Sequence, residues 1–168
     1  MERRFTVFRF IAYSLELLLL FVLQTTPSLL PEIYGGKPLL MIPAVMTIAF
    51  MEEQIPAMFF GLAGGALLDF GYSDTLGYYT IMLTIICFVI SFIFRDYMVV
   101  SFLNAMGFTA LITAALVSLY FIFFIALAGK GGLMYYVSHY ISRIVYTIVC
   151  TVPLYFINKF LFRNLMDF

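Results

Sequence analysis

Charged side chains inside apolar stretches are the residues of this sequence most suited to chemistry. Glu16 has leucine on both sides, and Arg143 lies within the last apolar stretch. A lone carboxylate inside a bilayer costs roughly 2.5 to 3.5 kcal/mol on insertion scales, so Glu16 must face protein or water, or carry a proton. We expect Arg143 to be its partner. A structural pair or a contact with another subunit is favoured for Glu16 over ion or proton transfer.

Small residues recur at every fourth position in the third apolar stretch. Ala57, Gly61, Gly65 and Asp69 share this spacing, which places them along one face of a helix. Small side chains let a second helix approach closely, and membrane proteins use this device because the hydrophobic effect does not drive helix association in lipid. We expect the face to pack against a helix of the same chain. Docking of a separate membrane partner is the alternative.

Asp69 lies at the end of its apolar stretch. There we expect a helix cap, or pairing with Lys37, Lys130 or a loop amide, in preference to a substrate or proton site. Asn104 lies in the fifth apolar stretch, and an asparagine there can hydrogen-bond to another helix for about 0.6 to 2 kcal/mol. Neither residue alone identifies an activity.

The sequence does not favour catalysis. His139 is the only histidine and follows Ser138, but neighbouring residues on a helix point in different directions, and a nucleophile needs its base within reach. Asp69 and Asp74 lack the Gly-x-Gly-Asp setting of intramembrane aspartyl proteases. We therefore expect a non-enzymatic protein with no cofactor.

Composition indicates an integral membrane protein. Of the 168 residues, 64% are hydrophobic and only 11% are charged, whereas soluble domains carry about 25% charged residues. The formal net charge is zero, so the basic surface of a nucleic-acid binder is missing. Cys87 and Cys150 lie within apolar runs and suggest neither a disulfide framework nor a metal pattern.

About 20 residues are needed for each membrane-spanning helix, so the length allows roughly six spans in a single domain covering residues 1–168. Apolar windows predict an all-α polytopic bundle with spans at residues 10–26, 38–51, 55–70, 76–94, 101–127 and 138–161. No small-x-small cleavage site follows the first window, which we interpret as a retained span. The second and third windows are short and predict either a tight hairpin or a re-entrant pair.

The distribution of basic residues predicts the orientation. Cytoplasmic loops carry an excess of lysine and arginine, and six spans with a cytoplasmic N-terminus give six basic residues inside against two outside. Both termini are therefore expected in the cytoplasm. The inside set is Arg3, Arg4, Arg9, Arg95, Lys159 and Arg163, and the outside set is Lys37 and Lys130.

The glycine-rich stretch also resembles the central motif of the rod shape-determining protein MreD family. The resemblance is concentrated in residues 56–77, and the chain length, span number and basic N-terminus agree with the family. The residues that carry it are Pro56, Gly61, Gly65, Ala66, Leu68, Asp69, Thr75, Leu76 and Gly77.

This resemblance implies a non-enzymatic component of the bacterial cell inner membrane that maintains cell shape through lateral peptidoglycan synthesis. It implies binding to MreC, in a complex with MreB filaments, RodA and a class B penicillin-binding protein. The family is similar in fold to the substrate-binding subunits of energy-coupling-factor transporters. The alternative is therefore a vitamin-transporter subunit, whose energy would come from a partner because this chain has no phosphate-binding Gly-rich loop.

Overall fold

The computed structural model describes residues 2–26, 38–72, 77–97, 101–126 and 133–166, and the secondary structure within these ranges is all helical. This confirms the expected all-α class for the described part of the chain. The elements are α1 (Glu2–Thr25), α2 (Met41–Met51), α3 (Gln54–Tyr72), α4 (Tyr78–Asp96), α5 (Phe102–Tyr120), the π-helix η1 (Phe121–Ala126) and α6 (Leu133–Met166).

Within the described residues, four segments are long and apolar enough to cross a membrane. They are Val7–Thr25, Tyr78–Asp96, Phe102–Phe124 and Arg143–Arg163. Only 22% to 33% of each window is buried inside the protein, so most residues of these segments lie on the outside of the bundle. Apolar side chains exposed in this way are suited to lipid, so the structure supports a membrane protein with at least these four candidate spans.

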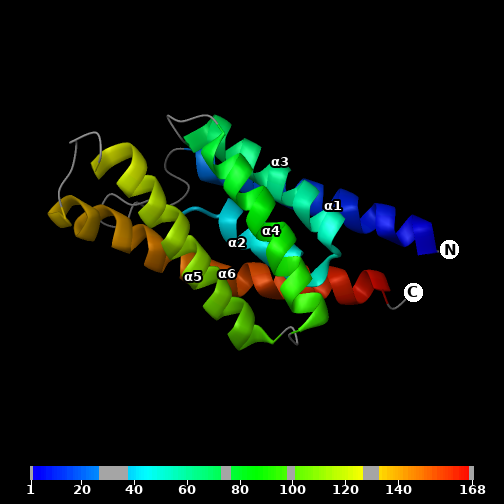
Figure 1. The fold of residues 1–168 in the computed structure, drawn as a ribbon. Coiled ribbons are helices and arrows are strands. Elements are labelled where there is room, and N and C mark those ends of the chain that lie inside the picture. Colours follow the sequence, from blue (N-terminus) through cyan, green and yellow to red (C-terminus); the bar gives the residue numbers. More distant parts are fainter. Residues whose placement is uncertain (1, 27–37, 73–76, 98–100, 127–132, 167–168) are drawn as a thin grey trace.

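Helix α2 forms the centre of the bundle. Every residue from 38 to 50 is buried, and α2 packs against each of the other five α-helices. Figure 1 shows it between α3 and α6. Its 11 residues extend only about 16 Å, against a hydrocarbon core of about 30 Å. The apolar composition of α2 thus reflects burial within protein.

Helices α2 and α3 form a hairpin, since α2 ends at Met51 and α3 begins at Gln54. The turn between them holds Glu52 and Glu53. We call this end of the bundle the hairpin end. The first turn of α1 and the last turn of α6 lie toward it in Figure 1.

Candidate functional site

The small-residue face of α3 is filled by α4. A Cβ atom added at Gly61 would lie 2.7 Å from the carbonyl oxygen of Leu83, and one added at Gly65 would lie 2.6 Å from both the Cα of Thr80 and the carbonyl oxygen of Tyr79. Real Cβ atoms do not approach other atoms so closely, so these glycines allow the two backbones to touch. The structure supports the interpretation of internal packing and leaves no room for a partner helix on this face.

The other small residues of α3 face different neighbours. A Cβ at Gly64 would collide with the side chain of Val45 on α2, and one at Gly71 would lie 2.6 Å from the ring of Phe21 on α1. Ala57 is fully buried. Helix α3 therefore uses missing side chains to pack closely against α1, α2 and α4 at the same time.

The Asp69 carboxylate caps α4. Its oxygens accept hydrogen bonds from the backbone N–H groups of Gly77 at 3.1 Å, Tyr79 at 3.1 Å and Thr80 at 2.9 Å, and from the Thr80 hydroxyl at 2.6 Å. The first N–H groups of a helix have no partner within the helix, and the helix dipole favours negative charge there. The expectation that Asp69 binds a loop amide or caps a helix is confirmed.

The remaining residues of the motif that the structure describes lie in α3 or at the start of α4. Pro56 lies in the first turn of α3, where the missing proline N–H removes no helical hydrogen bond. Gly77 adopts a φ of 97°, a left-handed conformation that favours glycine. Leu68 is buried and Ala66 is half-buried. Thr75, Leu76, Lys37 and Lys130 lie outside the described residues.

Glu16 is hydrogen-bonded to Asn158. The prediction that Arg143 is its partner is therefore wrong. The Asn158 amide donates to the Glu16 carboxylate at 3.1 Å and to the Thr47 hydroxyl at 2.7 Å. Arg143 precedes Asn158 by four turns of α6, about 22 Å along the helix axis. The structural interpretation of Glu16 is therefore supported within this chain, with an amide as its partner. Asn104 is half-buried in the first turn of α5.

The Asn158 side chain should contribute more to the stability of the protein than the negative charge of Glu16. Asn158→Leu removes both hydrogen bonds and is expected to destabilise the protein by about 2 kcal/mol, since interhelical hydrogen bonds in membranes contribute about 0.6 to 2 kcal/mol each. Glu16→Gln keeps an oxygen that can accept from Asn158 and should melt close to the wild type. Thermal unfolding in mild detergent measures both. A larger loss in Glu16→Gln would show that the carboxylate charge is needed.

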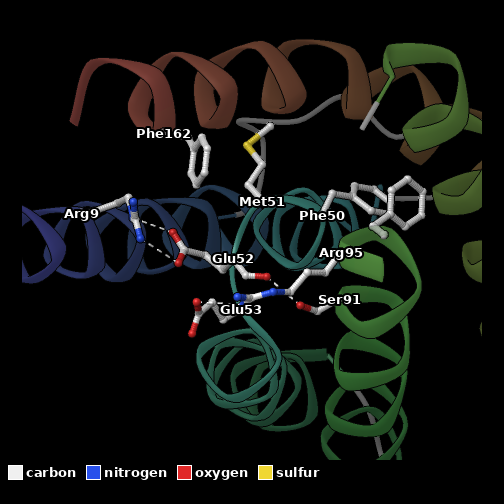
Figure 2. Close-up of a pocket in the computed structure, with 9 residues that line it drawn as sticks. Arg9, Phe50, Met51, Glu52, Glu53, Ser91, Arg95 and Phe162 are labelled. Carbon is white, nitrogen blue, oxygen red and sulfur yellow. Dashed lines mark hydrogen bonds and ion pairs between the residues drawn. The ribbon is translucent and has the colours of Figure 1, made fainter. Parts of the chain in front are cut away.

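A buried ion pair lies at the hairpin end (Figure 2). Nε of Arg9 lies 2.6 Å from Oε1 of Glu52, Nη2 of Arg9 donates to Oε2 at 3.0 Å, and the two side chains are only 14% and 2% exposed. Ser91 of α4 donates to the Glu52 backbone oxygen at 2.6 Å, and the Arg9 guanidinium lies 5.1 Å from the Phe162 ring centroid. This cluster joins α1, the hairpin turn, α4 and α6.

A second ion pair lies beside the first, and both line a pocket of about 370 Å³. Nη1 of Arg95 lies 2.8 Å from Oε1 of Glu53, with the side chains 53% and 69% exposed. Sequence reasoning missed this site. The available signal was the pair of acidic residues between two apolar windows, together with Arg9 and Arg95 near the ends of other windows.

Burial raises the pKa of the Glu52 carboxyl above its ordinary range, and the neighbouring Arg9 guanidinium opposes that shift. Without Arg9, the carboxylate would be buried with no counter-charge. The folded protein would then bind a proton at Glu52 more readily than the unfolded chain does, so its stability would increase as the pH falls.

Arg9→Gln is therefore expected to destabilise the protein in a pH-dependent manner. We expect a loss of about 2 kcal/mol at pH 8, between the values for exposed and fully buried ion pairs, and a smaller loss near pH 5 because Glu52 becomes neutral. Melting temperatures across this range measure the effect. Arg9→Gln combined with Glu52→Gln is the control, and its deficit should not vary with pH in this way. A pH-independent deficit in Arg9→Gln alone would contradict the ion-pair role.

Comparison with protein-family models, curated proteins and solved structures gives no match. Within the described residues, no three His, Cys, Asp or Glu side chains come together as metal ligands would. His139 lies on α6, but its side chain is outside the described part.

Proposed function

We propose that this protein is a non-enzymatic scaffold of the bacterial cell-elongation complex, which binds MreC and helps to maintain cell shape through lateral peptidoglycan synthesis. The observation that carries the proposal is the structural role of the residues in the MreD-like motif. Gly61, Gly65, Asp69 and Gly77 all serve to pack and cap the α3–α4 pair. A motif that sets helix positions suits a protein that acts by presenting a fixed surface to partners.

Internal packing changes where a partner could bind. Because α4 covers the glycine face of α3, a partner span would have to meet a surface that the helix pair leaves open. The outward face of α3 is one such surface, with Phe59, Leu62 and Phe70 exposed. In this proposal the glycines act indirectly, by holding that surface in place in the inner membrane, with MreB, RodA and a class B penicillin-binding protein in the same complex.

Affinity purification of the tagged protein in mild detergent, followed by mass spectrometry of proteins and retained small molecules, tests the proposal. We expect MreC to be recovered together with the wall synthases. An unrelated tagged membrane protein of similar size is the control for nonspecific recovery. Absence of MreC would contradict the proposal. Recovery of an ATPase module with a bound vitamin would assign the transporter function instead.

A further inference from the structure

The pocket at the hairpin end lies where three candidate membrane spans end. Arg9 is near the start of the span Val7–Thr25, Arg95 is near the end of Tyr78–Asp96, and Phe162 is near the end of Arg143–Arg163. Charged side chains near the ends of spans lie at the depth of the lipid headgroups. The pocket is therefore placed between the polar and apolar layers of the membrane.

Two kinds of surface line this pocket (Figure 2). Its walls are apolar and come from Phe50, Met51, Phe94 and Phe162, while its charged groups are the two ion pairs. A volume of about 370 Å³ falls within the range of about 300 to 1,000 Å³ that is common for small-ligand sites. A ligand that fills this pocket would need both polar and apolar groups.

The two ion pairs differ in how easily they can exchange partners. Arg9 and Glu52 make two contacts and are almost entirely buried, so separating them would leave buried charges without partners. Arg95 and Glu53 make one contact and are more than half exposed. Exposed pairs of this kind contribute only about 0 to 1 kcal/mol. A ligand can therefore replace the Arg95–Glu53 contact at little cost.

Opening the exposed pair would present a guanidinium beside a carboxylate. A ligand with a phosphate and a primary ammonium close together would satisfy both, because the phosphate accepts from Arg95 and the ammonium donates to Glu53. An exposed apolar stripe also leads from Arg95 along α4. Phe88 and Phe92 are 42% and 43% exposed and lie at positions i−7 and i−3 from Arg95, on the same helix face.

We propose that this pocket binds the headgroup of phosphatidylethanolamine, with the phosphate on Arg95, the ammonium on Glu53 and the acyl chains along the Phe88 and Phe92 stripe. The apolar stripe is the reason to assign a lipid instead of a soluble zwitterion. The buried pair Arg9–Glu52 forms the fixed floor of the site. The site does not depend on the scaffold function.

Competitive lipid retention tests this proposal. Purified protein in detergent is incubated with equimolar phosphatidylethanolamine, phosphatidylcholine and phosphatidylglycerol of identical acyl chains, and retained lipids are counted by native mass spectrometry. Choline has no N–H donor, so phosphatidylethanolamine should be retained about tenfold more than phosphatidylcholine, as expected for one hydrogen bond to a charged group. Equal retention of these two lipids, or stronger retention of phosphatidylglycerol, would overturn the proposal.

Three variants locate the site. Glu53→Ala should remove the preference for ethanolamine over choline, and Arg95→Gln should reduce retention of both lipids about tenfold through loss of one charge-assisted bond. Asp96→Asn is the matched control, because Asp96 is an exposed acid next to Arg95 that does not line the pocket. It should retain the wild-type preference. A preference that survives in Glu53→Ala, or is lost equally in Asp96→Asn, would refute the assignment.

Discussion

Gly65→Leu is expected to separate α3 from α4 and abolish the native fold. The added side chain would meet the backbone of Thr80 and Tyr79 at 2.6 Å, and backbone atoms of a packed helix cannot move aside as a flexible side chain can. Ordinary overpacking of a core costs roughly 1 to 3 kcal/mol. Here the whole helix must shift, which would also break the Asp69 cap, so we expect a larger loss.

A buried thiol provides the measurement. Cys87 is fully buried, and its Cβ lies 3.0 Å from the position of a Cβ at Gly61, so it reports directly on the α3–α4 contact. With Cys150→Ala as background, a maleimide dye should label Cys87 rapidly at room temperature in Gly65→Leu, and only on heating in the parent.

Gly107→Leu is the matched control for this experiment. Gly107 is a helical glycine of α5 with no atom within 4 Å of an added Cβ, and it is exposed. Leucine there should be tolerated and should gain slightly in helix propensity. If Gly65→Leu and Gly107→Leu show equal melting temperatures and equal protection of Cys87, the close approach of α3 to α4 is not a feature of the protein.

The spacing of the small residues correctly predicted that this face of α3 packs against a helix of the same chain. Helices that are adjacent in sequence are joined closely, so their contact can be inferred from local sequence alone. Residues at every fourth position must share a face, and a helix joined by a short turn is the nearest partner for that face. The same reasoning predicted a helix cap, or pairing with Lys37, Lys130 or a loop amide, for Asp69, and backbone N–H groups at the start of the following helix are the partners observed.

The partner of Glu16 could not be found in this way. Asn158 is 142 residues away in sequence, and periodicity identifies the inner face of α6 without giving its depth relative to α1. Arg143 was chosen for its charge, yet an amide N–H can also donate to a carboxylate oxygen when it lies at the same depth in the bundle, as Asn158 does. Choosing between them requires the register of α1 against α6, which only the packed bundle supplies.

The central position of α2 was also beyond sequence reasoning. An apolar segment suits lipid and protein interiors alike, because both lack water. The burial of every residue from 38 to 50 follows from the surrounding helices. The pairing of Arg9 with Glu52 at the hairpin end depends on that same central placement, since the acidic turn directly follows α2.

Asp69→Asn is expected to weaken the protein by about 4 kcal/mol, because hydrogen bonds to a charged group contribute about 1.5 to 3 kcal/mol each and the amide keeps only one accepting oxygen. Its NH₂ group would face donors of the α4 N-terminus, and the favourable charge at the helix dipole would be lost. Thermal unfolding in mild detergent measures the loss. Hydrogen exchange should accelerate at the amides of Tyr79 and Thr80, which the carboxylate binds directly.

Thr80→Val is the control for the Asp69 cap, since it removes only the hydroxyl bond at 2.6 Å and should cost about 1 kcal/mol. The two variants together separate a structural role from a chemical one. If Asp69→Asn retained wild-type melting and slow exchange at Tyr79 and Thr80, the carboxylate would not be needed as a cap. A loss of partner binding in that otherwise stable variant would instead assign Asp69 to an interface or a proton site, the role that its hydrogen bonds to Gly77, Tyr79 and Thr80 argue against.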